Sequence, residues 1–275
     1  MIKQIYIVKV LNNNAILTQS SKHNTAILVG RGIGFGQSGN TYGEIDESKI
    51  EKSFFNYDET LKTQLIDMIT TFDEDIIEVS NQIIEIAEKK FGELSQHVYV
   101  SLTDHISFAI DRLKNNHVIE NPFYEQIRLI LSEEYQIALQ ARDIINDKFD
   151  IVIPDHEVGF IAFHINAARE NIKVNYVVKE MRTYKEILIM IEDYINMKLD
   201  PILASDLYLI VQKIVKNEQL PLAFLIKDIT NLSLFPNTKL QKLYKKIIKY
   251  IEETNSIKLK LQQKSVLAEF IKNIN

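Results

Sequence analysis

Residues 25–36 read TAILVGRGIGFG, a β-branched run that passes into a cluster of glycines, and this pattern indicates a β-sheet in the N-terminal part of the chain. Extended patterns precede it at residues 4–11 (QIYIVKVL) and 15–18 (AILT), separated by Asn12-Asn13-Asn14. Asparagine tolerates positive φ angles and suits a tight hairpin turn. The first 43 residues therefore predict a small antiparallel sheet of four strands. So small a sheet buries little surface alone, which favours a dimer.

The glycine cluster, with five of the chain's eight glycines in residues 30–39, has two interpretations. A dinucleotide-binding glycine motif opens a helix inside a βαβ unit, whereas these glycines fall between two strands, which disfavours that kind of site. The simpler interpretation is a hairpin that needs positive φ angles. The other is a surface for unstacked RNA bases, with Arg31 for phosphate or guanine edges, Phe35 for stacking, and Asn12 and Asn14 for base edges. The residues alone favour the hairpin.

The composition is that of a soluble globular protein of 275 residues, with 46% hydrophobic and 25% charged residues. Cysteine is absent, which rules out a disulfide frame, a thiol nucleophile and a cysteine-ligated metal site. No apolar run reaches the roughly 18 residues of a membrane span, and the N-terminus lacks a signal-peptide pattern. We therefore expect a cytoplasmic protein without membrane insertion.

Charge is distributed unevenly along the chain. The formal net charge is −5, but residues 1–43 carry +4 with no Asp or Glu, and residues 44–60 carry −4. A basic module thus precedes an acidic body. This contrast is typical of a chain whose N-terminal segment binds a polyanion.

The body after about residue 60 has apolar residues at three- and four-residue spacing, the period of amphipathic helices. Six helices are predicted first, at residues 61–71, 73–91, 101–115, 122–132, 135–149 and 156–168. A connector is predicted at residues 170–178. Helices then resume from Lys179, with breaks near Pro201, Pro221, Pro236 and Asn255.

The helical body also shows a degenerate internal repeat. Sliding the sequence by 106 lays residues 159–165 on 265–271, and sliding it by 107 lays residues 105–109 on 212–216. Two copies of one helical domain of about 100 residues would explain this pattern.

Two of the six histidines, His105 and His164, lie on predicted amphipathic helices. A lone histidine on a mostly apolar helix is most often a core or interface residue, and the residues alone favour that role. The pair beside Asp104 could instead bind a metal or transfer protons. A neutral imidazole could also accept a phosphoryl group at pH 7. No hydrolase spacing accompanies either histidine.

Four motifs, in this order and at this spacing, resemble the BglG/SacY transcriptional antiterminators over nearly the whole chain. They are VKVLNNN at 8–14 with GRGIGF at 30–35, ID at 45–46 with KIEK at 49–52 and Phe54, SLTDHI at 101–106, and EVGFIAFHI at 157–165. The GIGFG version at 32–36, with NPF at 121–123 and EYQIA at 134–138, is most similar to the glucose-permease-operon antiterminators.

The resemblance implies an α+β multidomain fold. A small antiparallel β RNA-binding domain, the co-antiterminator domain, would span residues 1–58. Two all-α phosphotransferase-system regulation domains would span residues 62–170 and 171–275, the second of them divergent. The implied function is that of an RNA-binding antiterminator, which as a homodimer stabilises a leader-RNA hairpin and so prevents termination of a sugar-uptake operon. It implies neither an enzyme nor a cofactor or metal.

The resemblance also assigns site residues. The positions that match the RNA-contacting motif are Lys9, Asn12, Asn14, Gly30, Arg31, Gly32 and Phe35. His105 and His164 match the phosphorylated histidines, with Asp104 as a supporting residue. The sugar permease of the phosphotransferase system, or its carrier protein HPr, is the expected phosphoryl donor, and phosphorylation is expected to inhibit.

The second regulation domain departs from the family pattern, because no histidine follows His164 in the chain. The internal alignment places Gln212 and Phe270 where the family usually has histidines. We therefore expect no phosphorylation there, and a role only in dimerisation or coupling. The competing hypothesis is a metal-binding protein or an enzyme in which His105 and His164 act together.

Overall fold

The computed structural model describes residues 2–19, 25–55, 57–218 and 238–274. They form two compact units. The first unit comprises Met1–Val118, Leu139–Pro154 and Ala168–Asn171, and the second comprises Ile119–Ala138, Asp155–Ala167 and Ile172–Asn275. The predicted α+β architecture, a small sheet followed by helices, is confirmed.

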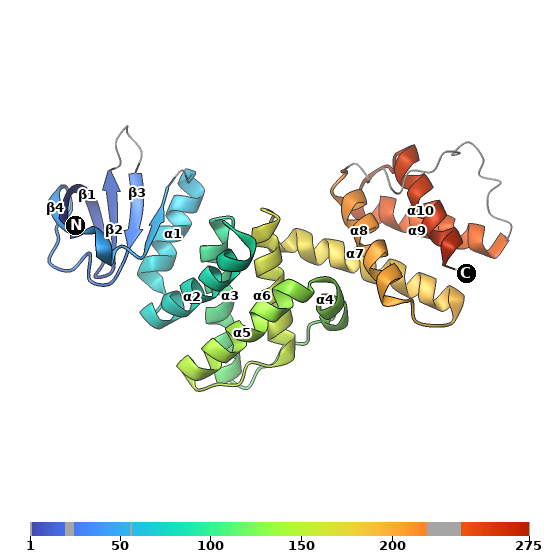
Figure 1. The fold of residues 1–275 in the computed structure, drawn as a ribbon, viewed down its shortest axis with the longest axis horizontal. Coiled ribbons are helices and arrows are strands. Elements are labelled where there is room, and N and C mark those ends of the chain that lie inside the picture. Colours follow the sequence, from blue (N-terminus) through green and yellow to red (C-terminus); the bar gives the residue numbers. More distant parts are fainter. Residues whose placement is uncertain (1, 20–24, 56, 219–237, 275) are drawn as a thin grey trace. The chain divides into compact units, whose positions relative to one another are not determined.

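The N-terminal sheet of the first unit is antiparallel throughout. Its strands are β1 (Ile2–Asn12), β2 (Ala15–Gln19), β3 (Thr25–Val29), β4 (Thr41–Asp46) and β5 (Lys52–Phe54). Their order is β4-β1-β2-β3-β5, and Figure 1 shows β4, β1, β2 and β3 side by side. The expected four strands are one too few, because β5 lies beyond residue 43 and pairs with β3. Three residues are too few for a strand periodicity to show.

The β1–β2 hairpin turns at Asn13 and Asn14, as predicted, and Asn12 pairs with Ala15. The expected reason for the turn is wrong, since neither Asn13 nor Asn14 has a positive φ. Instead, Oδ1 of Asn12 accepts the backbone N–H of Asn14 at 2.8 Å. Such a local side-chain hydrogen bond holds the turn without left-handed backbone.

A small apolar core holds the sheet together. It consists of Ile7, Ile16, Leu28, Ile33 and Ile45, all buried. Helix α1 (Glu59–Thr71) packs against β1 and is drawn beside the sheet in Figure 1. The N-cap of α1 is Asp58, whose carboxylate accepts the N–H of Leu61 at 2.7 Å and so fixes where the helix begins.

The first unit continues with α2 (Glu74–Phe91) and α3 (His97–Lys114), and both α1 and α2 pack on α3. Helix α2 ends at Gly92, whose φ of 84° favours glycine. All three helices were predicted, with α3 beginning four residues earlier than its pattern indicated.

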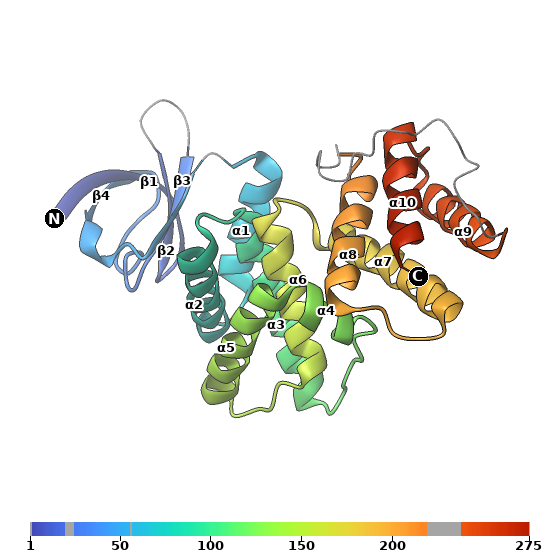
Figure 2. The same ribbon diagram turned by 45° about the vertical axis from the view of Figure 1, so that its right-hand side comes forward.

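The second unit is helical in its described residues. Its elements are α4 (Tyr124–Ile130), the first part of α5 (Ser132–Phe149), most of α6 (Asp155–Arg169), α7 (Val174–Ile195), α8 (Pro201–Val215), α9 (Thr238–Asn255) and α10 (Leu261–Asn273). Helix α7 packs on α8 and α9, and α10 packs on both α8 and α9, as can be followed in Figure 2.

One predicted boundary in this unit is wrong. The connector expected at residues 170–178 is shorter, because α7 already begins at Val174. The β-branched and aromatic run from Val174 to Val178 has low helix propensity, and packing overrides it. The breaks near Pro201 and Asn255 coincide with helix ends, whereas Pro221 and Pro236 lie outside the described residues.

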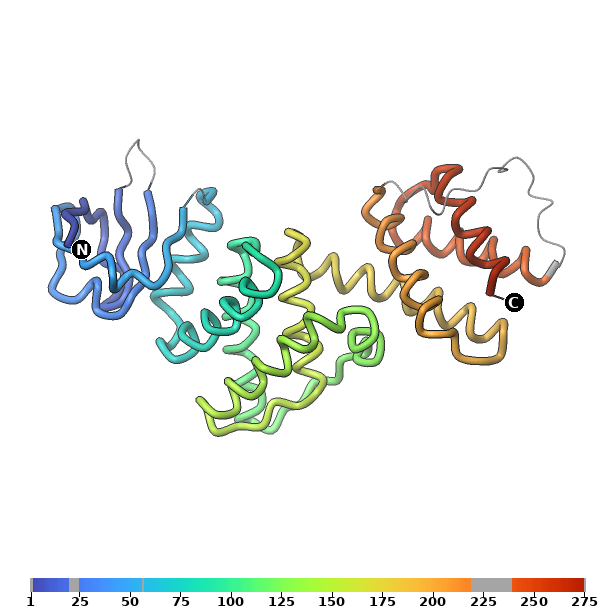
Figure 3. The backbone as a smooth tube through the Cα atoms, viewed as in Figure 1, coloured from blue at the N-terminus to red at the C-terminus, as the bar shows by residue number. Residues whose placement is uncertain are grey.

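The structure supports the internal repeat, and the corresponding helices can be followed along the tube in Figure 3. Helices α5 and α9 differ by 106 residues at both ends. The residues that follow them, Asp150 and Ser256, have positive φ angles of 51° and 53°. One further pair of contacts repeats at the same offset: Asn146 Oδ1 accepts the Ile153 N–H at 2.8 Å, and Glu252 Oε1 accepts the Leu259 N–H at 3.0 Å.

The offset between α3 and α8 is not the 107 expected from the sequence. The buried residues of α3 are best matched to those of α8 at an offset of 105. The matched buried pairs are Tyr99 with Ala204, Leu102 with Leu207, Thr103 with Tyr208, Ile106 with Val211, and Ala109 with Ile214. The counterpart of His105 is therefore the buried Ile210, and not Gln212. At the offset of 106 residues that relates α5 to α9, the counterpart of His164 is Phe270.

In the part of the chain that the structure describes, no helix has the length and apolarity needed to span a membrane.

Candidate RNA interface and histidine sites

The glycine-rich loop between β3 and β4 is built by close backbone contacts as well as by positive φ angles. Gly32 and Gly36 have φ angles of 71° and 70°, which favour glycine. Gly30 and Gly34 are required for space instead, because a Cβ at Gly30 would collide with the carbonyl oxygen of Lys49, and one at Gly34 with that of Asn12. The glycines thus bring the loop onto the β1–β2 turn.

Both asparagines of the predicted RNA motif have structural partners. Asn14 receives the Gly32 N–H on Oδ1 at 2.7 Å, and its backbone carbonyl receives the Gly30 N–H at 2.8 Å. The amide of Asn12 donates to the carbonyl of Ile69 at the end of α1, at 2.9 Å. Asn12 and Asn14 therefore fix the shape of the loop and join it to α1, a role that the sequence did not predict.

Three side chains of the predicted RNA-binding residues lie exposed at the surface. Lys9, Arg31 and Phe35 are exposed, and Phe35 is 75% exposed. The backbone N–H of Arg31 donates to Glu51 Oε1 at 3.3 Å, so the backbone is fixed while the guanidinium lies at the surface. On one surface, an exposed aromatic ring can stack on a base and an exposed cation can bind a phosphate.

Residues of the loop also line a cleft of the first unit that faces α2. On the sheet side the cleft is lined by Asn12, Asn14, Gly30, Arg31 and Glu51. On the α2 side it is lined by acidic residues, namely Glu74, Asp75, Glu78 and Glu85. Lys148 partly neutralises them through Asp75, at 2.8 Å, and Glu78, at 3.0 Å. The sequence does not predict this acidic wall, because the charge along α2 does not reveal what the helix faces.

Contacts of Lys52 and Phe54 connect the sheet to the helices beside this cleft. Lys52 Nζ lies 3.2 Å from Glu88 Oε2 and 4.7 Å from the centre of the Tyr99 ring, on which Phe54 packs edge-on. Burial acts to lower the pKa of Lys52, but its interactions with Tyr99 and Glu88 outweigh it and leave the pKa raised. The ammonium group therefore stays charged in this contact.

The close approach at Gly30 gives a testable prediction. Replacing Gly30 with alanine should destabilise the sheet by about 3 kcal/mol, because the new methyl group meets backbone that has no room to move. Hydrogen exchange of the full-length protein should show lost protection in β3 and β5. Gly39→Ala is the matched control, since its Cβ would lie 3.2 Å from the Val8 carbonyl oxygen and needs only a small adjustment. Unchanged hydrogen exchange in the Gly30→Ala variant would contradict the close contact between Gly30 and the Lys49 carbonyl group.

His105 lies on α3 in the first unit and is half-buried, next to the exposed Asp104. Partial desolvation of the Asp104 carboxyl group raises its pKa, and the charge of His105 acts in the opposite direction. The two side chains are therefore electrostatically coupled. A negative group on His105 would turn this attraction into repulsion.

His164 lies on α6 in the second unit and is also half-buried. Its helix carries the buried polar residues Glu157 and Asn166, and Asn166 Nδ2 donates to the buried Glu134 at 3.1 Å. His156 has a structural role, since its Nδ1 accepts the N–H of Asn121 at 3.1 Å. Polar residues along the helix thus hold α6 in place, and His164 itself is half-buried.

Within the described residues, no three histidine, aspartate or glutamate side chains lie close enough together to hold a metal ion. The structure therefore adds no ligand set to the metal-binding hypothesis.

Two family descriptions match the chain: the CAT RNA binding domain over residues 5–63 and the PRD domain over residues 81–168. The beta-glucoside operon antiterminator of Dickeya chrysanthemi is 31% identical over 193 residues, 70% of this chain and 67% of the relative. Transcription antiterminator LicT of Bacillus subtilis is 32% identical over 191 residues, 68% of this chain and 67% of the relative. Protein GlcT of Staphylococcus haemolyticus is 31% identical over 194 residues, with 70% and 67% covered.

A solved structure is also similar. The crystal structure of GlcT CAT-PRDI matches with a TM-score of 0.54 and 35% sequence identity, and the match covers 60% of this chain and 98% of that chain.

A CAT RNA-binding domain followed by a PRD domain defines an RNA-binding transcriptional regulator controlled by the phosphotransferase system. The chain belongs to the BglG/SacY family of transcriptional antiterminators, in which GlcT-type proteins are among its relatives. It is a regulatory protein and not an enzyme, and the hypothesis of a histidine-based metal site or enzyme is not favoured.

Proposed function

We propose that the N-terminal domain, residues 1–58, holds a leader-RNA hairpin through Lys9, Arg31 and Phe35. The observation that carries this proposal is the exposure of Arg31 and Phe35 on a loop whose backbone is fixed by hydrogen bonds. Such a loop loses little conformational freedom when RNA binds. Gly30, Gly32, Asn12 and Asn14 act by shaping this surface. A terminator reporter with the chain's own leader sequence tests the function, since read-through should depend on the protein.

The domain acts as a homodimer in this proposal. Ile2 and Tyr42, on the paired strands β1 and β4, are 69% and 68% exposed, and in this proposal a second copy covers both side chains. Sedimentation of residues 1–58 tests this. A stable monomer that still binds the hairpin would count against the dimer.

Control is proposed to reside in the first regulation domain, residues 62–170, through phosphorylation of His105 and His164. Both side chains are half-buried, so a charge added to either ring would alter the packing around it. The sugar permease or HPr is the proposed phosphoryl donor. Residues 171–275 form the second domain and offer Ile210 and Phe270 at the corresponding positions, so we assign that domain to dimerisation or coupling.

The acidic residues of α2 should weaken RNA binding. They share a cleft with Arg31, so they repel a polyanion that approaches from that side. Replacing the exposed Glu74 and Glu85 with glutamine should raise the affinity of the full-length protein for leader RNA about fivefold, and more at low salt. Electrophoretic mobility shift with the leader transcript measures this. Glu120→Gln with Glu186→Gln removes the same charge elsewhere and should have no effect. An equal gain in RNA affinity for both variants would show that the effect comes from net charge alone.

A further inference from the structure

Helix α9 presents a lysine-rich face that the function described above does not use. Its exposed lysines are Lys239, Lys242, Lys245, Lys246 and Lys249. At 3.6 residues per turn these side chains fall within an arc of about 120° and extend over about 15 Å. The buried residues Leu243, Ile247 and Ile251 occupy the opposite side of the helix.

The charge of this part of the chain is opposite to that of the rest of the helical body. Residues 238–275 contain nine lysines against three glutamates, a formal charge of +6. Residues 61–237 carry −11. The positive charge is therefore concentrated in the last 38 residues and is hidden in the net charge of the whole chain.

The fold does not require lysines on this face, as the internal repeat shows. At the offset of 106 that superimposes the ends of α5 and α9, the same five positions of α5 are Glu133, Gln136, Leu139, Gln140 and Asp143. Their formal charge is −2, against +5 on α9. The difference between two helices with the same place in one domain type points to a ligand rather than to stability.

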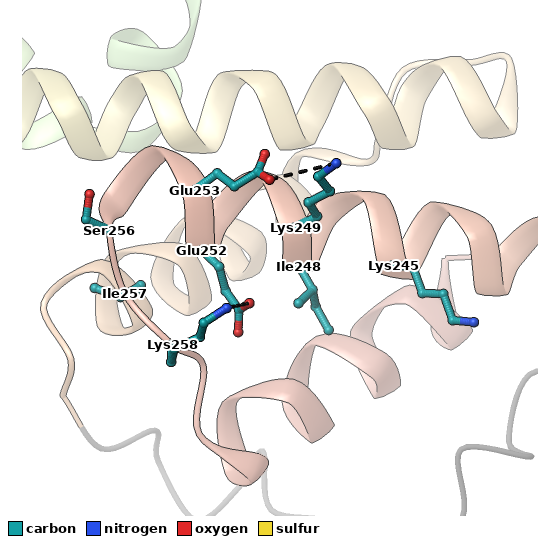
Figure 4. A pocket seen from close by; sticks show the side chains of 8 residues that line it. All are labelled: Lys245, Ile248, Lys249, Glu252, Glu253, Ser256, Ile257 and Lys258. Carbon is teal, nitrogen blue, oxygen red and sulfur yellow. Dashed lines mark hydrogen bonds and ion pairs between the residues drawn. The ribbon is translucent and has the colours of Figure 1, made fainter.

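Three of these lysines are also available. Within the described residues, Lys242, Lys245 and Lys246 have no ion-pair partner. The acidic residues of the helix are confined to its C-terminal end, where Glu253 lies 3.8 Å from Lys249 and Glu252 pairs with Lys258. Figure 4 shows both pairs, with Lys245 extending away from them. The face therefore presents several cations with little internal neutralisation.

We propose that this face of α9 binds the phosphate backbone of RNA without base preference, as a second contact to the transcript that the N-terminal domain recognises. Lysine is depleted in protein–protein interfaces, whereas interfaces with nucleic acid are strongly positive. Lysine binds phosphate as a point charge, and no aromatic side chain is exposed on this helix to read a base. This proposal rests on RNA being the ligand of the protein.

The test measures binding of the full-length protein to a fluorescent oligouridine of about 20 nucleotides, by anisotropy, between about 50 and 200 mM salt. The variant carries Lys242→Gln, Lys245→Gln and Lys246→Gln. Each phosphate contact to a single strand contributes about 0.7 to the slope of log affinity against log salt. The slope should therefore fall by about 2, and the affinity at about 100 mM salt by roughly tenfold.

Two matched variants separate local contacts from net charge. Arginine at the same three positions keeps the charge and should retain oligouridine binding. Lys89→Gln with Lys90→Gln and Lys173→Gln removes three exposed lysines elsewhere and should leave the slope unchanged. An α9 variant with wild-type affinity and slope would overturn the proposal and leave an acidic protein as the occupant of this face.

The outcome is distinguishable from a failure of the N-terminal RNA site. A variant with Arg31→Ala and Phe35→Ala should keep oligouridine binding through α9. Loss of oligouridine binding in that variant, with none lost in the α9 variant, would assign all RNA contacts to the N-terminal domain and overturn the proposal.

Discussion

The double variant Arg31→Ala, Phe35→Ala is expected to lose about 100-fold or more in affinity for the leader hairpin. Stacking on an aromatic side chain contributes roughly 1–3 kcal/mol per base, and a bidentate arginine contact to a base about as much. At 1.4 kcal/mol for each tenfold change, the two losses together lower the affinity by more than an order of magnitude at the low end of these ranges and by nearly three orders at the middle. Mobility shift with the leader transcript, at one stated salt concentration, measures the effect.

This variant should remain folded. Phe35 is 75% exposed, and the loop is held by backbone hydrogen bonds and by Asn14, none of which involve the two side chains. The matched control is Lys89→Ala with Tyr176→Ala, which removes one exposed cation and one exposed ring outside the sheet. If the Arg31, Phe35 variant binds the hairpin with an affinity within about twofold of wild type, this loop is not the RNA-binding surface.

The same loop shows how far the sequence could predict the site. The exposed residue types, a cation and an aromatic ring among glycines in an acid-free segment, could be found from the sequence alone. The roles of Asn12 and Asn14 could not, because their partners, the Ile69 carbonyl and the Gly32 N–H, are distant in sequence. Asparagine is equally suited to reading a base edge and to fixing a turn.

The helices could be predicted well where the apolar periodicity is strong. They could be predicted only poorly where three-dimensional contacts determine which side of a helix is buried. The break at Asn255 and the repeat at an offset of 106 are visible in the sequence, since α5 and α9 keep the same buried positions. The offset for α3 was wrong by two residues, because α8 is shorter and its mostly apolar sequence hides which side is buried. The pairing of β5 with β3 could not be predicted either, because a strand of three residues is too short to show a periodicity.

Control by the sugar should depend on His105 and His164. Replacing His105 and His164 with alanine should give antitermination that no longer needs the sugar, so that the reporter signal without sugar rises to the induced level. Phosphorylation adds a charge of about −2 to a side chain. At His105 that charge would lie beside Asp104, whose carboxyl group is coupled to His105 in the structure. The repulsion should disfavour the packing that forms without phosphate, and alanine cannot accept the phosphoryl group.

The measurement is a terminator reporter with and without the sugar, together with mapping of acid-labile phosphate. His97→Ala with His117→Ala is the matched control, because both histidines are exposed and lie in the same predicted domain. That control should keep sugar dependence, since neither side chain has a place in the proposed phosphorylation. Each single variant should give partial sugar independence if both sites inhibit. An inactive His105, His164 double variant that is folded, or phosphate mapped to the chain after residue 170, would overturn the scheme, because the second domain offers only Ile210 and Phe270 at the corresponding positions.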